Sequence, residues 1–405
     1  MEFISLYKKF VQSNNEDFNS FYLSRFSSES AIHLPLKINE YDAFVFIHPS
    51  VLNKVAKIYS LDKEVSESFI QLPTVALEQY VKKSLIDEIE YTNAIEGVVS
   101  TRQEIGELLE GINKRRTVES RFEGIVNKYV LLLRRKEIQI NNVFDIRKIY
   151  DDMLYQEIES ENKDNVPDGK LFRKSNVWVY DERNEKIHAG IMPEEKIILY
   201  LEEALRFLKN EEIDFLIRVS VFHFLFGYIH PFYDGNGRVD RFISSYLLSK
   251  QLTSIVGFRL SMTIKENIRN YYSAFKETDD KRNRGDITTF VMAFLDILID
   301  ALEKTKKYAT NKNQDLKYYT EIVDKQEYSS KTSLKVIKLL LQVELFSKSG
   351  LLISDISRIS NNTPKTVAKA INELKEKSMI KTIMYGKRKQ YTADLDSIGQ
   401  LDEKY

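Results

Sequence analysis

Residues 213–229 are apolar on nearly every side, so a helix here would have no face suited to water. Such a helix must lie at the centre of a domain. The longer apolar run over 214–233 contains Asp214, Arg218 and His223, which predicts a buried core helix and not a membrane span. The chain has only 7 prolines and 14 glycines in 405 residues, which favours helices around it as well. We therefore expect a mainly α fold.

Helical patterns recur along most of the chain, with one exception that reads as a β-hairpin over 176–190. The chain length suggests two or three domains. We divide the chain into an N-terminal region (1–115), a core (116–307), a connector that could be helical (308–330) and a C-terminal module (331–405). The expected helices cover 52–109 (broken near Leu72-Pro73), 117–139, 143–158, 193–209, 213–229, 236–250, 262–277 and 285–306.

Composition excludes several kinds of protein. There is no cysteine, so disulfides, thiolate metal sites and cysteine nucleophiles are all excluded. Lys plus Arg and Asp plus Glu each number 60, so a globally basic nucleic-acid binder is not indicated, although a local basic patch could exist. The first ten residues place Glu2 before the apolar residues and two lysines after them, the wrong order for a secretory signal. We expect a cytoplasmic protein without a membrane partner.

Residues 230–241 (His-Pro-Phe-Tyr-Asp-Gly-Asn-Gly-Arg-Val-Asp-Arg) combine a helix end with a new helix start. Pro231 should end the apolar helix at His230. Gly235, Asn236 and Gly237 then form a tight turn before the next helix. Such a loop can aim several backbone N–H groups at an anion, and glycine lets the backbone approach a phosphate closely. The block therefore predicts a phosphate-binding loop.

The side chains of this block fit phosphoryl chemistry. Asp234 is a hard oxygen ligand suited to a magnesium ion that bridges phosphates. Arg238 and Arg241 are three residues apart, so both could face one side of the new helix and reach phosphate oxygens. A neutral His230 could accept a proton from an incoming hydroxyl. The plain alternative is a helical corner with solvated charges.

The block resembles the signature of the Fic family, His-Pro-Phe-x-Asp-Gly-Asn-Gly-Arg-x-x-Arg, at every specified position, and the resemblance extends over about residues 30–300. It implies a helical Fic core with a β-hairpin flap, and transfer of AMP from ATP to a Ser, Thr or Tyr hydroxyl of a target protein or of the chain itself. Doc-type relatives, which phosphorylate proteins, have lysine where this chain has Gly237.

The resemblance also implies a role for each residue of the block. His230 would be the general base, Phe232 would anchor the loop in the core, and Asp234 would bind magnesium. The turn would hold the α- and β-phosphates, and the two arginines would hold the β- and γ-phosphates. The residues of the turn and the arginines are Gly235, Asn236, Gly237, Arg238 and Arg241.

A second motif lies upstream, where residues 92–97 read Thr-Asn-Ala-Ile-Glu-Gly. Thr92 and Glu96 share one helix face, and Gly97 can cap the helix C-terminus. Alone, this is an ordinary helix end with a solvated glutamate. The string is similar to the Fic inhibitory motif in a preceding domain, which implies that Glu96 pairs with Arg241 and hinders ATP binding.

The hairpin at 176–190 resembles the flap of the family, with Val177, Trp178 and Val179 on its first strand. Its edge could pair with an extended target segment. The alternative is a plain surface hairpin. Two further groups are more ordinary: we expect His223 to be a hydrogen-bonded core histidine, and the pair Tyr271 and Tyr272 could border the adenine or belong to the core.

The C-terminal module shows the order helix, helix, helix, hairpin over 331–395, which resembles a winged helix-turn-helix. Thr363 and Pro364 suit the start of its third helix. That helix would carry Lys365, Thr366 and Lys369, and the wing would carry Lys387, Arg388 and Lys389. In DNA readers these positions meet bases and phosphates, but the fold is also reused to bind proteins. A DNA partner and a protein partner both stay open.

Two rival functions therefore remain at this point. One is a different enzyme on the same fold, which removes AMP or uses another nucleotide donor. The other is a regulator that acts mainly by binding DNA or a partner protein through 331–395.

Overall fold

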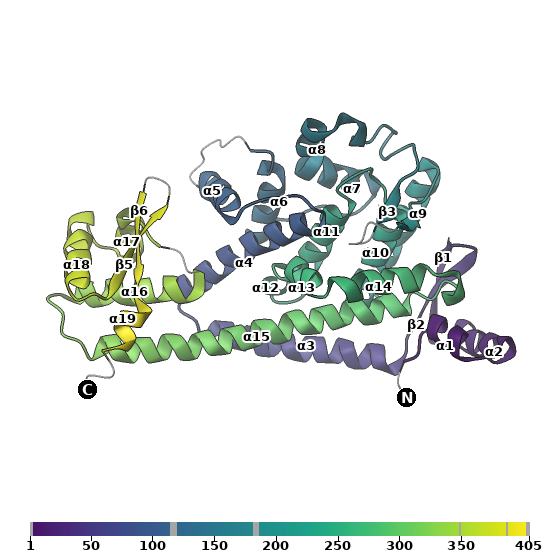
Figure 1. The fold of residues 1–405 in the computed structure, drawn as a ribbon. Coiled ribbons are helices and arrows are strands. Elements are labelled where there is room, and N and C mark those ends of the chain that lie inside the picture. The colour runs from purple at the N-terminus through teal and green to yellow at the C-terminus, as the bar shows by residue number, and fades with distance from the viewer. Residues whose placement is uncertain (1–2, 114–119, 181–185, 348–349, 386–387, 402–405) are drawn as a thin grey trace. The chain divides into compact units, whose positions relative to one another are not determined.

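The computed structural model describes residues 3–113, 120–180, 186–347, 350–385 and 388–401. The described chain is mainly helical with three short two-stranded hairpins, which confirms the expected fold class (Figure 1). It divides into two compact units. The first comprises residues 1–62 and 86–303, and the second comprises residues 63–85 and 304–405.

The N-terminal part of the first unit forms structure that the sequence patterns did not predict. Two helices precede an antiparallel hairpin: α1 (Leu6–Gln12), α2 (Asn15–Phe26), β1 (Ala31–Ile38) and β2 (Tyr41–Phe46). Side chains along the second half of β1 alternate between buried and exposed, as expected for a strand with one face on a core. The buried pair Arg25 and Asp286 ties this region to the core at 3.4 Å.

The remaining elements of the first unit are helices and one short hairpin. Within the unit, α10 (Phe215–Ile229) packs against α11 (Asn236–Gln251), which also contacts α6 (Glu123–Leu133), α12 (Ser254–Gly257) and α13 (Leu260–Glu266). The others are α3 (Pro49–Ile70), α4 (Thr74–Ile95), α5 (Arg102–Asn113), α7 (Val143–Tyr150), α8 (Gln156–Glu161), α9 (Glu194–Leu208), α14 (Ile268–Asp279) and α15 (Thr288–Asp324). The helices α3, α4 and α15 contribute residues to both units.

Several helices differ from their predicted ranges. The helical stretch expected over 52–109 is interrupted a second time, between α4 and α5, and the helix expected over 117–139 is α6, Glu123–Leu133. The helix expected over 143–158 contains a π-helical turn, η1 (Asp151–Tyr155), between α7 and α8. The helix expected over 262–277 is divided at Asn267 into α13 and α14. The helix expected to end at 306 continues to Asp324, so most of the segment 308–330 is helical.

The helix α10 is buried on almost every side, as its composition predicted. It packs against α9 and α11. His223 is fully buried, and its ring nitrogens lie 2.8 Å from Ser244 Oγ and 2.8 Å from Tyr271 Oη. The prediction of a hydrogen-bonded core histidine is therefore confirmed.

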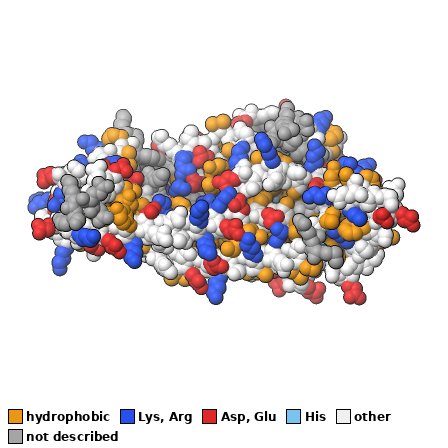
Figure 2. All heavy atoms as spheres, turned by 60° about the horizontal axis from the view of Figure 1, so that its bottom comes forward, with side chains coloured by type: hydrophobic (Ala, Val, Ile, Leu, Met, Phe, Trp, Pro, Cys, Tyr) orange, Lys and Arg blue, Asp and Glu red, His pale blue; other side chains and the backbone are white. Residues whose placement is uncertain are grey.

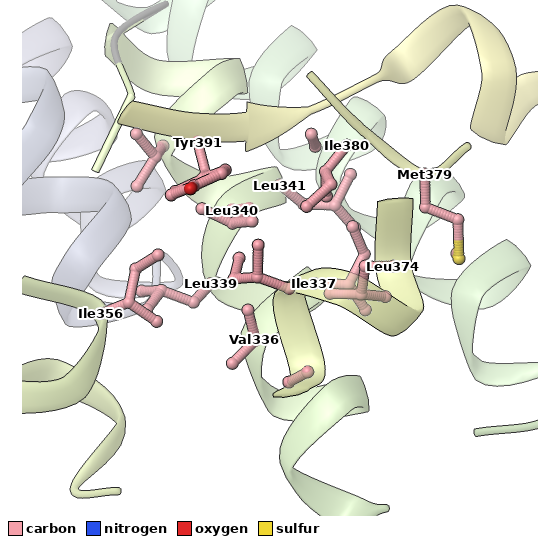
Figure 3. Close-up of a cluster of buried hydrophobic side chains, with 14 of the residues drawn as sticks. Val336, Ile337, Leu339, Leu340, Leu341, Ile356, Leu374, Met379, Ile380 and Tyr391 are labelled. Atoms are coloured by element: carbon pink, nitrogen blue, oxygen red, sulfur yellow. The ribbon is translucent and has the colours of Figure 1, made fainter. Parts of the chain in front are cut away.

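The C-terminal residues of the second unit have the predicted element order, with one more short helix at the end. The elements are α16 (Lys331–Ser347), α17 (Ile353–Ser360), α18 (Pro364–Glu376), β5 (Ile380–Tyr385), β6 (Arg388–Ala393) and α19 (Leu395–Gly399). Thr363 Oγ1 accepts a hydrogen bond from Thr366 N, which confirms the predicted cap of α18. Figure 3 shows the core, in which side chains of α16, α17, α18 and the hairpin meet. The assignment as a winged helix-turn-helix stays a prediction.

Basic and acidic side chains are interspersed on the face of the molecule drawn in Figure 2. Among the described residues, every helix is too short or too polar to span a lipid bilayer.

Candidate active site

The loop that joins α10 to α11 is held in a fixed shape by its own residues. His230 follows α10 in the left-handed conformation (φ 52°), and Gly235 precedes α11 with φ 80°. The Asn236 side chain accepts a hydrogen bond from Phe232 N (2.9 Å) and donates one to Phe232 O (2.8 Å). The buried Phe232 ring stacks on Tyr150 at 3.9 Å between centroids, so the prediction that Phe232 anchors the loop in the core is confirmed.

Glycine has a distinct structural effect at two positions of this loop. At Gly235 the backbone is left-handed, and a Cβ atom would lie 2.6 Å from Leu154 Cδ1. At Gly237, in the first turn of α11, a Cβ atom would lie 2.2 Å from the carboxylate oxygen Oε1 of Glu96. The absence of a side chain at Gly237 thus lets a carboxylate approach the N-terminus of α11.

His230 lies at the entrance of the loop with one ring nitrogen engaged. Its Nδ1 atom is 3.3 Å from the carbonyl oxygen of Gly227, which can only accept, so Nδ1 carries the proton in this contact. Nε2 makes no hydrogen bond to a described residue and keeps its lone pair. Burial lowers the pKa of His230 to about 4, although the Glu96 carboxylate opposes this shift. The imidazole is therefore neutral at physiological pH.

Arg173 holds the backbone of His230 in place, and no sequence pattern singled it out. Its fully buried guanidinium donates to the carbonyl oxygens of His230 (2.8 Å), Ser175 (2.8 Å), Ile191 (2.8 Å) and Ile229 (3.3 Å). Burial lowers the pKa of Arg173 to about 10. The contacts join the loop after α10 to the segments on either side of the hairpin, although no carboxylate among the described residues pairs with the charge.

We expect Arg173→Met to destabilise the protein by about 3 kcal/mol, because it leaves several buried carbonyl groups without a donor. Thermal unfolding should show a fall of roughly 5–10 °C in the transition of the first unit. Arg206→Met is the matched control, since the Arg206 side chain is 71% exposed and pairs only with Glu203. Equal transitions for the two variants would contradict the role assigned to Arg173.

The two arginines of α11 take different partners, although their spacing of three residues makes them neighbours on the helix surface. The fully buried Arg238 donates to Glu157 Oε1 on α8 at 2.6 Å, and its Nη2 atom is 3.8 Å from Asp234 Oδ1. Arg241 instead reaches α4. A spacing of three residues on a helix leaves the side chains about 60° apart, enough for the long guanidinium groups to take different partners.

Arg241 is bound by the upstream motif. It donates to Thr92 Oγ1 (2.9 Å), to Thr92 O (3.0 Å) and to Glu96 Oε1 (2.7 Å). Burial alone would raise the pKa of Glu96, but the Arg241 guanidinium outweighs burial and lowers it below the usual value. Gly97 has φ 75° and Val98 N donates to Asn93 O, which gives the predicted glycine cap of the helix end. The structure thus brings together two motifs that lie 145 residues apart.

A cavity of about 230 Å³ opens beside the loop. It is lined by the upstream glutamate, the flap, the loop and α14, with Asp240 and Arg241 on the α11 side. The predicted site residues that line it are Glu96, Trp178, Val179, His230, Asp234, Gly235, Asn236, Gly237 and Arg241, together with Tyr271 and Tyr272. Thr92, Gly97, Val177 and Arg238 do not line this cavity.

The flap is a short antiparallel hairpin of β3 (Trp178–Tyr180) and β4 (Lys186–Ala189). Residues 181–185, between the two strands of the predicted hairpin, lie outside the described residues. His188 fastens β4 to the core, with Nε2 2.7 Å from Tyr228 O and Nδ1 3.0 Å from Asp279 Oδ2. Trp178 is 44% exposed, so the outer part of the flap is accessible.

Asp240 is a further residue of the site that the sequence analysis did not single out. Its side chain is almost fully buried at the cavity, with Oδ1 3.2 Å from His223 Nδ1. Burial raises the pKa of Asp240 well above its usual value, which favours a protonated carboxyl group. It occupies a position of the motif that the signature leaves unspecified, so the pattern gave no signal for it.

Asp234 is the residue at which a magnesium ion could be held. Its side chain is 37% exposed, and its Oδ2 atom makes no hydrogen bond or ion pair with a described residue. No cluster of three or more ligating side chains occurs among the residues that the structure describes. A single carboxylate fits magnesium, which is often bound through one or two carboxylates plus substrate phosphates and water.

Comparisons with known proteins agree with this geometry. Residues 142–248 match the model of the Fic/DOC family. The chain is 27% identical over 222 residues to a probable protein adenylyltransferase of Aquifex aeolicus, covering 55% of this chain and 57% of the relative. It is 27% identical over 256 residues to the protein adenylyltransferase Fic of Drosophila erecta, covering 62% and 47%. The alignments thus span about half the length of these curated relatives.

One solved structure resembles most of the chain. It is a Fic family protein from Desulfovibrio desulfuricans, with a TM-score of 0.51 and 18% sequence identity. The alignment covers 86% of this chain and 97% of that protein, which supports the fold.

Proposed function

We propose, on the premise that this chain is a Fic family protein, that it transfers AMP from ATP to a Ser, Thr or Tyr hydroxyl of a protein. The observation that carries the proposal is the position of His230. His230 lines the same cavity as the glycine loop at the N-terminus of α11, and its Nε2 atom makes no hydrogen bond to a described residue. A base and a phosphate-binding loop therefore meet in one site.

The reaction follows from this arrangement. His230 Nε2 takes the proton of the target hydroxyl, and the oxygen attacks the α-phosphorus of ATP. A bond forms between that oxygen and phosphorus, while the bond from the α-phosphorus to the bridging oxygen of the β-phosphate breaks. Pyrophosphate leaves with the electron pair. Backbone N–H groups of Gly235, Asn236 and Gly237 would stabilise the phosphate charge, with Arg241 as the cation.

Magnesium would be held by Asp234 together with the phosphates of ATP. When bound, the ion neutralises phosphate charge. The role of Asp234 is to position it.

We expect Asp234→Asn to raise the magnesium concentration needed for half-maximal transfer by about tenfold or more, because the neutral amide is a weaker ligand for a hard cation. The measurement is the transfer rate at increasing magnesium concentration with ATP held constant. Asp164→Asn is the control, since Asp164 is exposed, lies in the 3₁₀ turn η2 (Lys163–Asn165) and does not line the cavity. An unchanged requirement in Asp234→Asn would remove Asp234 from this role.

We further propose that Glu96 inhibits the enzyme. It occupies Arg241 and lies against Gly237, where an anionic phosphate is expected. A carboxylate there both competes for the guanidinium and repels the triphosphate. This agrees with the inhibitory role that the motif at 92–97 implies.

Label transfer tests the proposed reaction. Glu96→Gly protein and a cell lysate are incubated with ATP labelled on the α-phosphate, and in parallel with ATP labelled on the γ-phosphate. Protein labelling from the α-phosphate alone supports AMP transfer, and labelling from the γ-phosphate alone would instead support phosphate transfer. Other labelled nucleotides and a protein that already carries AMP test for another donor and for AMP removal.

A further inference from the structure

The C-terminal module, residues 331–405, carries a net charge that the total for the whole chain conceals. Residues 331–405 contain 14 Lys and Arg against 8 Asp and Glu, a net charge of +6. Residues 1–330 contain 46 Lys and Arg against 52 Asp and Glu, a net charge of −6. The neutral total is therefore the sum of an acidic part and a basic part, and such an asymmetry is typical of a chain with one nucleic-acid-binding part.

The acidic side chains of the module are largely engaged within the second unit. Glu373 accepts hydrogen bonds from Ser329 and Ser333, and Glu344 accepts one from Thr392. Asp394 and Asp396 pair with Lys381. Of these four carboxylates only Glu373 belongs to α18; Glu344 lies on α16, and Asp394 and Asp396 follow β6.

The outer face of α18 is polar and basic. Val367, Ala370, Ile371 and Leu374 are buried in the core of the module, where Figure 3 labels Leu374, while four exposed polar residues occupy the other side of the helix before its last turn. These are Lys365, Thr366, Lys369 and Asn372. Neither lysine forms an ion pair with a described residue, and the exposed acid of this helix, Glu376, lies at its C-terminal end.

The hairpin adds further basic residues. Arg388 and Lys389, at the start of β6, are exposed and form no ion pair with a described residue. The third basic residue predicted for the wing, Lys387, lies outside the described residues. The turn between α17 and α18 contains Asn361 in the left-handed conformation (φ 54°), so the two helices follow each other after a short turn.

We propose that this module binds duplex DNA, with α18 in the major groove and the β6 residues on the phosphate backbone. Lysine and asparagine side chains on one helix face can reach base edges, and lysine and arginine neutralise phosphates. The outer face of α18 exposes no large hydrophobic side chain, and such side chains are common anchors of protein–protein interfaces. This face therefore favours DNA over a protein partner. Among the described side chains of the hairpin, the large hydrophobic ones that are exposed are Ile383 and Met384, both on β5.

The test is fluorescence anisotropy of a labelled mixed-sequence duplex of about 30 base pairs with the full chain. We expect binding at roughly 50 mM salt that weakens steeply toward about 200 mM, because the lysines and arginines displace counterions. The double variant Lys365→Ala, Lys369→Ala should bind about tenfold or more weakly, with a shallower dependence on salt.

The matched control is Lys338→Ala, Lys381→Ala. It removes the same charge from the same module, but at lysines that are already paired, with Asp324 in one case and with Asp394 and Asp396 in the other. We expect this control to change affinity less than about twofold.

The proposal would be overturned by no binding of the full chain at low salt, or by equal weakening in both double variants. If Ile383→Ser, Met384→Ser abolishes capture of a protein partner and no duplex binds, the module is a protein-binding one. Thermal unfolding of each variant confirms that it is folded.

Discussion

Glu96→Gly is expected to raise the rate of AMP transfer by at least about tenfold over the wild-type chain. The substitution removes the carboxylate that accepts a hydrogen bond from Arg241 at 2.7 Å and lies over Gly237. A charge-assisted hydrogen bond contributes about 1.5–3 kcal/mol, and each 1.4 kcal/mol corresponds to about tenfold. The measurement is the initial rate of label transfer from α-labelled ATP, on the protein itself and on a lysate.

Two variants separate the loss of the carboxylate from damage to the helix. Glu96→Gln keeps the shape of the side chain but removes its charge, so it should also activate, to a smaller extent. Glu90→Gly introduces the same flexible residue six residues earlier, within α4, where Glu90 pairs with Arg102 at 3.3 Å. It should leave the rate near that of wild type. Equal activation by Glu90→Gly would mean that loosening of α4, and not removal of the carboxylate, releases the enzyme.

His230→Ala in the Glu96→Gly background is expected to reduce transfer by about 10²–10⁴-fold, because it removes the group that accepts the hydroxyl proton. The neighbouring contacts of Arg173 are made to the backbone oxygen of residue 230, so the loop should keep its shape. Rates are measured at saturating ATP, and ATP binding is measured separately. Loss of ATP binding in parallel with loss of rate would show that His230 shapes the loop and does not act as the base.

The pH dependence provides a second readout for His230. Burial lowers the pKa of His230 to about 4, and Glu96 opposes that shift, so the pKa should be no higher in Glu96→Gly. The base form is the neutral one, present above the pKa and lost as the pH falls through it. The rate should therefore show no one-proton decrease between about pH 7 and about pH 5.5. A tenfold fall over that interval would place the pKa of the base near its ordinary value.

Sequence reasoning predicted the structural features that depend on residues close together in the chain. The α10–loop–α11 corner follows from an all-apolar stretch, a proline and two glycines, and these are local signals. The pairing of Glu96 with Arg241 joins residues far apart in the chain, and it was expected only through the family resemblance. No periodicity could have supplied it.

The parts that were missed depend on tertiary contacts. The residues next to Arg173 in the sequence form no motif that would predict its hydrogen bonds to four backbone carbonyl groups. The direction of Arg238 is set by the buried Glu157 on α8, a helix that follows a π-helical turn. The hairpin of β1 and β2 combines short apolar runs with a proline, a pattern too weak to favour a strand over a loop.

The contact between Glu96 and Arg241 lies within one chain, so its strength does not depend on protein concentration, and dilution cannot relieve it. Any ligand that needs the Arg241 guanidinium can bind only when Glu96 has released it. The apparent dissociation constant of that ligand therefore equals its intrinsic value divided by the fraction of molecules in which the pair is open. A small shift in that internal equilibrium therefore changes the occupancy of the site at a fixed nucleotide level. The side chain of one glutamate thus sets the nucleotide concentration at which the site is half occupied.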